Sequence, residues 1–93
     1  MVLFVGKHGV KDFESWKSGT KAALSDPKRN AEWGILESGT YRAVDGNVIV
    51  THKFATVEAA KKYKAMMESA ENKAFRDQIG IVEPFTMWIA EEF

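Results

Sequence analysis

The sequence contains no cysteine among its 93 residues. Disulfide bonds and thiolate chemistry are therefore excluded, and packing alone must hold the fold together. Lysine plus arginine and aspartate plus glutamate number 13 each. Without an excess of positive charge, nucleic acid and an anionic membrane are not expected as partners. The chain also lacks a phosphate-binding glycine loop and a nucleophile elbow.

Long apolar runs are missing as well. The apolar run at the start, Met1 to Val5, is far too short for the hydrophobic region of a signal peptide. We therefore expect a cytoplasmic protein with no membrane segment. A chain of this length with 45% hydrophobic residues predicts one globular domain over residues 1–93. Such a domain buries only about 60 to 65% of its unfolded surface, so a partner subunit would add stability.

Four segments with alternating apolar residues predict β-strands. Asp45-Gly46, between the second and third segments, is typical of a tight hairpin turn. Gly39 inside the second segment indicates a bulge or bend, and Pro84 places the last strand at a sheet edge. The predicted strands are Val2 to His8, Glu32 to Val44, Asn47 to Phe54 and Val82 to Ala90.

Two amphipathic helices are predicted between these strands. Asp12 and Thr56 are good N-caps, because their side chains can accept free backbone N–H groups of a first helical turn. The first helix should cover Phe13 to Leu24, and Ser69 marks a bend or restart in the second. Lys28 to Ala31 is expected to be a polar loop. Right-handed crossovers then give a ferredoxin-like βαββαβ α+β fold, with a four-stranded antiparallel sheet ordered 4-1-3-2 and two helices on one face.

One stretch of the chain resembles a known family. His8-Gly9-Val10-Lys11-Asp12-Phe13-Glu14-Ser15-Trp16 resembles the His-x-Val-x-Asp-aromatic-x-x-Trp opening of small dimeric α+β barrel proteins, in the antibiotic-biosynthesis-monooxygenase-like superfamily. The resemblance continues through Val50-Thr51-His52-Lys53-Phe54 and Glu58-Ala59-Ala60. It implies a homodimer in which two sheets pack open face to open face, with ligand cavities between each sheet and its own helices.

Members of that superfamily include cofactorless monooxygenases, haem-degrading enzymes, lactone isomerases and cyclases, so the fold leaves the chemistry open. The haem-binding histidine pattern on the second helix is absent from this sequence, and none of the enzymes' catalytic sets maps onto it. No cofactor is therefore expected.

His8 and His52 are the two candidate catalytic residues. Imidazole titrates near neutral pH, so a cavity histidine could act as a general base toward a phenolic or enolic substrate. A buried histidine that only forms hydrogen bonds is the competing interpretation. In antiparallel neighbouring strands the two histidines should lie too far apart to bind one metal ion, and no metal site is predicted.

Aromatic side chains and one methionine on the predicted elements could line a ligand cavity, since flat rings provide an apolar wall. Aromatic residues at such spacing are more often plain core. The candidate ligand-binding residues are Trp16, Trp33, Tyr41, Phe54, Tyr63 and Met67.

A second set of side chains predicts a dimer interface. Several strands carry apolar residues on both faces, whereas helices can cover only one face. Lys7, Arg42 and Lys53 are expected at the rim of the uncovered face. The predicted interface residues are Leu3, Val5, Leu36, Ile49, Thr51 and Trp88.

These features lead to two functional hypotheses. The first is a small-molecule-binding homodimer that acts, as a cofactorless monooxygenase-, isomerase- or cyclase-like enzyme, on a small aromatic or polyketide-like compound. The alternative is a non-catalytic ligand-binding or stress-related dimeric module. Whether the protein is an enzyme is left open by the sequence.

Overall fold

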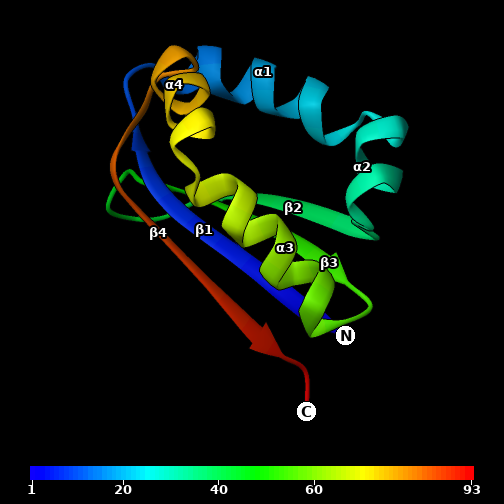
Figure 1. Ribbon diagram of the computed structural model, residues 1–93. Helices are drawn as coiled ribbons and strands as arrows, with labels where there is room; N and C mark the ends of the chain where they lie inside the picture. The colour runs from blue at the N-terminus through cyan, green and yellow to red at the C-terminus, as the bar shows by residue number, and fades with distance from the viewer.

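The computed structural model describes residues 1–93 and consists of one antiparallel sheet covered on one side by helices (Figure 1). The strand order is β2-β3-β1-β4, which is the predicted order read from the other edge. No helix is both long and apolar enough to cross a lipid bilayer. The strands are β1 (Val2–Val10), β2 (Glu37–Arg42), β3 (Val48–Phe54) and β4 (Ile81–Glu91), and the helices are α1 (Phe13–Leu24), α2 (Pro27–Trp33), α3 (Val57–Glu68) and α4 (Ala70–Gln78).

The predicted helix starts are confirmed. The Asp12 carboxylate accepts the backbone N–H of Glu14, and the Thr56 hydroxyl accepts that of Ala59, as N-caps should. Ser69 also acts as predicted, because it ends α3 and caps α4 by accepting the N–H of Asn72. The second predicted helix is therefore two helices, packed over β1, β3 and β4.

The predicted loop at Lys28 to Ala31 is wrong, because these residues belong to helix α2. Asp26-Pro27 ends α1 as expected, but the same pair also starts a helix. The Asp26 carboxylate accepts two backbone N–H groups, and proline fits the first helical position, where no N–H is needed. Gly34, with φ of 75°, ends α2. The chain thus has four helices in place of the predicted two, and β2 begins at Glu37 instead of Glu32.

The core lies between the sheet and α3. Phe4 and Phe54 point from the sheet toward the helices and are almost fully buried, as is Tyr63 of α3. Ala60, one turn before Tyr63, has no exposed surface, so α3 approaches the sheet closely at this point. We call this side of the sheet the helix-covered face.

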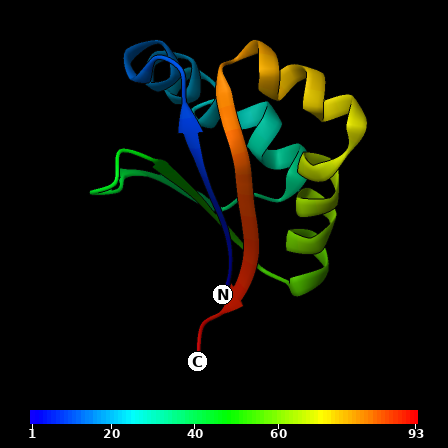
Figure 2. The same ribbon diagram turned by 90° about the vertical axis from the view of Figure 1, so that its left-hand side faces the viewer.

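The opposite side of the sheet, here called the open face, has no layer over it (Figure 2). The strand register places on it Val5, Ile49 and Trp88, as predicted. Arg42 was expected at its rim, and that prediction is wrong: alternation places Arg42 on the helix-covered face, where its guanidinium stacks 4.1 Å from the ring centre of Phe13. Three rows of residues run across the open face: Glu37–Lys53–Leu3–Ala90, Gly39–Thr51–Val5–Trp88 and Tyr41–Ile49–Lys7–Thr86.

The expected bulge at Gly39 is absent, because the β2–β3 register is regular from Glu37 to Arg42. The register shift occurs instead between β1 and β4, at Lys7 to Gly9. Gly39 has a packing role. A Cβ atom there would lie 2.9 Å from both the Thr51 and the Tyr41 hydroxyl oxygens, so only glycine leaves room for the tyrosine ring to lie back along the open face.

Two phenylalanines allow a matched test of the core. Phe54 has no exposed surface, whereas Phe93 is fully exposed. We expect Phe54→Ala to lower the free energy of unfolding by about 3 to 5 kcal/mol, or to prevent folding, because it leaves a cavity in the core. Phe93→Ala should change it by less than about 0.5 kcal/mol. Urea unfolding at one protein concentration would measure both, and similar losses for the two variants would contradict this placement of the core.

Candidate functional site

The most connected polar group of the interior is centred on His52. This imidazole is 1% exposed and uses both ring nitrogens: Nδ1 lies 2.7 Å from the Ser38 hydroxyl oxygen, and Nε2 lies 3.1 Å from the Tyr63 hydroxyl oxygen. Arg29 in turn donates from Nη2 to the Tyr63 oxygen over 2.6 Å. We call Arg29, Tyr63, His52 and Ser38 the polar relay. It joins four elements, α2, α3, β3 and β2.

The hydrogen bonds of the polar relay assign the tautomer of His52. The Tyr63 oxygen already accepts from Arg29, so its own proton has His52 Nε2 as the available acceptor. The proton of His52 then lies on Nδ1 and is donated to Ser38. Burial, assisted by the nearby Arg29 cation, lowers the pKa of His52 to about 4. The imidazole is therefore neutral at pH 7.

Within the polar relay, Tyr63 is an uncharged phenol and Arg29 is the cation. Burial raises the pKa of the Tyr63 hydroxyl, and the opposing effect of Arg29 is smaller, so the phenol keeps its proton at neutral pH. Arg29 Nη1 is buried and has no hydrogen-bond partner. A buried donor in this state costs free energy unless a ligand or water accepts from it. Because residues 28–31 were predicted to form a loop, Arg29 was not predicted as a site residue. The Asp26-Pro27 pair, which starts α2, was the sequence signal that could have placed it on a helix.

His8 lies in a different environment at the other end of β1. It is 3% exposed, donates from Nδ1 to the Gly9 carbonyl over 2.7 Å, and contacts the edge of Trp16 with ring centres 5.8 Å apart. Burial lowers its pKa, against smaller raising effects of the Gly9 hydrogen bond and of Glu83. His52 pairs with Phe4, four residues from His8 along β1, so the two histidines are separated by about 13 Å along the strand direction. No group of three or more histidine, aspartate or glutamate side chains is arranged to hold a metal ion.

The predicted ligand-binding residues do not share one cavity. Phe54 and Tyr63 are packed in the core, and Met67 is partly buried against it. Trp33 lines an open groove of about 790 Å³ between α2 and α3 and touches Tyr63 from that side. Trp16 lines a smaller cleft beside α1, and Tyr41 reaches the rim of that cleft from the open face.

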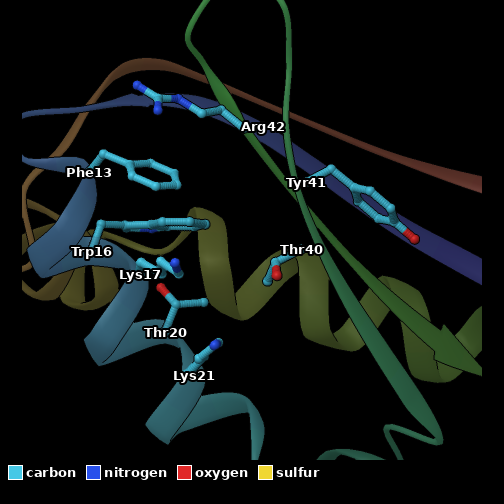
Figure 3. A pocket seen from close by; sticks show the side chains of 8 residues that line it. All are labelled: Phe13, Trp16, Lys17, Thr20, Lys21, Thr40, Tyr41 and Arg42. Carbon is cyan, nitrogen blue, oxygen red and sulfur yellow. The ribbon is translucent and has the colours of Figure 1, made fainter.

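The smaller cleft has a volume of about 180 Å³ and lies between α1 and the end of β2 (Figure 3). Figure 3 shows the ring of Phe13 above that of Trp16 at one side, and Thr40 across the cleft from them. The remaining contacts come from one face of α1 and from β2. We call this space the α1–β2 cleft; its lining residues are Phe13, Trp16, Lys17, Thr20, Lys21, Thr40, Tyr41 and Arg42.

Five of the six predicted interface residues lie on the open face, because Leu3, Val5, Ile49, Thr51 and Trp88 fall in its three rows. Leu36 precedes β2 and is 57% exposed. Trp88 faces away from the core as predicted, since its neighbours Met87 and Ile89 pack against the core cluster. The two lysines of the face are paired within the chain, Lys7 with Asp45 at 2.9 Å and Lys53 with Glu37 at 3.3 Å.

Strand order, helix placement and the open face together define the chain as a ferredoxin-like α+β protein. Neither a protein-family model nor a curated protein sequence matches it. Solved structures do match in fold. A Nitrosomonas europaea protein provisionally assigned as an antibiotic biosynthesis monooxygenase is 17% identical, with a TM-score of 0.60 over 99% of this chain and 98% of that one.

Two further solved structures match this chain in fold. A protein described as an antibiotic biosynthesis monooxygenase has a TM-score of 0.63 at 7% identity, covering 100% of this chain and 99% of the other. A protein from an uncultured marine organism, described as a dimeric ferredoxin-like protein, has a TM-score of 0.62 at 17% identity, covering 96% and 91%. The chain therefore has the fold of the antibiotic-biosynthesis-monooxygenase-like proteins, and the predicted resemblance is confirmed at the level of the fold.

The pKa of His52 predicts how stability depends on pH. In the unfolded chain the imidazole titrates near 6.5, whereas in the folded protein it titrates near 4. Between these values the unfolded state binds a proton that the folded state does not, so the free energy of unfolding should fall as the pH is lowered from 6.5 to 4, by up to about 3 kcal/mol.

The matched variant is His52→Gln, whose amide can still bond to Ser38 and Tyr63 but does not titrate. Urea unfolding of both proteins between pH 7 and pH 4 should give a clearly weaker pH dependence for the variant, which retains the contribution of His8. Equal slopes for the two proteins would show that His52 is not the buried neutral group described here.

Proposed function

We propose that this protein is a homodimer whose open sheet faces pack together and that it binds a small aromatic or polyketide-like compound. The observation that carries the dimer is the composition of the open face. Its centre is formed by Val5, Ile49 and Trp88, with Leu3 and Thr51 beside them. Trp88 remains 42% exposed in the single chain. A second sheet would remove this surface from water.

Energy and charge both favour that assembly. Burial of apolar surface contributes roughly 25 cal/mol per Å², and a standard interface removes about 800 Å² from each subunit. Because Lys7 and Lys53 are neutralised within their own chain, two open faces would meet without uncompensated like charges. A structurally similar protein is described as dimeric and ferredoxin-like, which supports a dimer for this chain.

A charge at the centre of the open face should disrupt the dimer. We expect Val5→Glu or Ile49→Glu to give monomeric or unfolded protein in multi-angle light scattering, because a carboxylate would be buried without a partner. Lys61→Glu, on the exposed side of α3, is the control and should leave the dimer intact. If the unmodified protein scatters as a folded monomer at micromolar concentration, the dimer proposal is wrong.

For the activity, the polar relay favours a cofactorless enzyme. The unpartnered Nη1 of Arg29 is a donor that could hold the oxygen of a phenol, enol or carbonyl, and the Tyr63 oxygen fixes the guanidinium by accepting from Nη2. Donors fixed in advance around a developing oxyanion lower the barrier to proton transfer. In this proposal the hydrogen bond to His52 Nε2 fixes the orientation of the Tyr63 hydroxyl, and the hydrogen bond from His52 Nδ1 to Ser38 fixes the tautomer of the imidazole.

A non-catalytic ligand-binding or stress-related module is the second candidate. It is favoured by the absence of a free hydrogen-bonding position on His52. Both nitrogens of His52 are occupied, and neither histidine lines the α1–β2 cleft or the α2–α3 groove. In such a protein the relay would serve only to satisfy buried polar groups.

A ligand screen followed by product analysis separates the two candidates. Aromatic and polyketide-like compounds that raise the melting temperature would be incubated with the protein and analysed by mass spectrometry. If the relay is catalytic, Tyr63→Phe, which removes only the hydroxyl, should slow product formation by about 10²-fold or more while thermal stabilisation by the ligand persists.

Ser18→Ala removes a hydroxyl from the exposed surface, outside the relay and outside both lined spaces, and should keep the full rate. Stabilisation without any product, or product formation that Tyr63→Phe and His52→Gln leave unchanged, would rule out the catalytic candidate and leave the binding module.

A further inference from the structure

The α1–β2 cleft collects positive charge that nothing in the chain neutralises. Lys17 and Lys21 of α1 and Arg42 of β2 all line it, and no aspartate or glutamate does. Four other lysines of the chain are within 4 Å of a carboxylate, whereas none of these three cations forms such a pair. In a protein whose charges balance overall, this is a local concentration of free cations.

The cleft also has an aromatic wall. The Phe13 and Trp16 rings are 6.2 Å apart and inclined by 33°. Trp16 is 6% exposed, so its indole is held firmly in place and presents a small apolar surface to the cleft. Arg42 stacks over Phe13 on the far side, which fixes the position of its guanidinium. Thr20 and Thr40 add two hydroxyl groups that can donate hydrogen bonds (Figure 3).

The volume of the cleft limits the size of its ligand. Pockets for drug-sized molecules measure about 300 to 1,000 Å³, and the α1–β2 cleft is only about 180 Å³. An apolar cavity of about 150 Å³ is known to hold one benzene ring. A single ring with one small substituent therefore matches this space, whereas part of a fused-ring compound would extend out of the cleft into water.

We propose that the α1–β2 cleft binds a monocyclic aromatic anion, with the ring against Trp16 and the carboxylate or phenolate beside Lys17 and Lys21, while Arg42, on the far side of Phe13, adds positive charge at longer range. The apolar wall selects for the ring, and the cations select for the charge. Neither group suffices alone, because an isolated contact between exposed charges contributes little in water. This inference rests on the proposed binding function and narrows it to a class of ligand and a place.

Benzoate is the probe, and benzamide and acetate are its matched controls. Benzamide keeps the ring without the charge, and acetate keeps the charge without the ring. In NMR titrations of the full protein, we expect benzoate to shift the Trp16 indole N–H resonance at millimolar concentration and to bind roughly tenfold more tightly than either control. Added salt should weaken the binding of benzoate.

Charge-removing variants then locate the site. Lys17→Gln and Lys21→Gln should each weaken benzoate binding by roughly threefold to tenfold. Lys61→Gln removes an equal charge from the exposed side of α3, outside the cleft, and should have no effect. Lys17 and Lys21 are both exposed, so neither substitution should disturb the packing of the aromatic wall.

Several results would overturn the inference: no shift of Trp16 at millimolar benzoate, equal affinity for benzoate and benzamide, or unchanged affinity in Lys21→Gln. If the protein is a dimer and another aromatic compound binds elsewhere while Trp16 is unaffected, the cleft inference fails and the proposed function stands. If the protein is a monomer and no aromatic compound binds, both fail.

Discussion

The packing of Tyr63 is the interaction on which most of this structure depends. Its ring is 1% exposed and meets Phe4, His52 and Phe54 at centroid distances of 5.1, 4.9 and 5.7 Å, so it anchors α3 to the two central strands. Its hydroxyl bridges His52 and Arg29, which ties α2 to the same centre. The ring supplies apolar burial, and the oxygen satisfies polar groups that could not otherwise lie in the core.

One-sided coverage of the sheet is the second constraint. The helices lie on one face, so every strand must present its alternate residues to the other (Figure 2). At the centre of that face Val5 is only 8% exposed even in the single chain, because Trp88 and Thr51 flank it in the same row. Around this apolar centre the charged residues are paired in their own chain. In the proposed dimer, a second open face would cover this apolar centre.

The positions of the charged residues in this protein are more informative than their total numbers. Equal numbers of acidic and basic residues conceal two separate environments. In the interior, burial and the nearby Arg29 cation keep His52 neutral, and one guanidinium nitrogen of Arg29 has no partner. At the surface, Lys17, Lys21 and Arg42 line one cleft, because a face of α1 lies beside the end of the edge strand β2. Both arrangements bring together residues that are distant in sequence.

The sequence alone determined the elements whose signals are local: the span of α1, the caps at Asp12 and Thr56, the restart at Ser69 and the strand order. Each depends on neighbouring residues or on general rules of chain connection. Asp26-Pro27 was ambiguous, because the same pair can end one helix and begin the next. Only the tertiary structure paired His52 with Ser38, Tyr63 and Arg29, and only it moved Arg42 from the open face to Phe13. Periodicity specifies that two residues share a face, but it carries no information on which side chains meet across a fold.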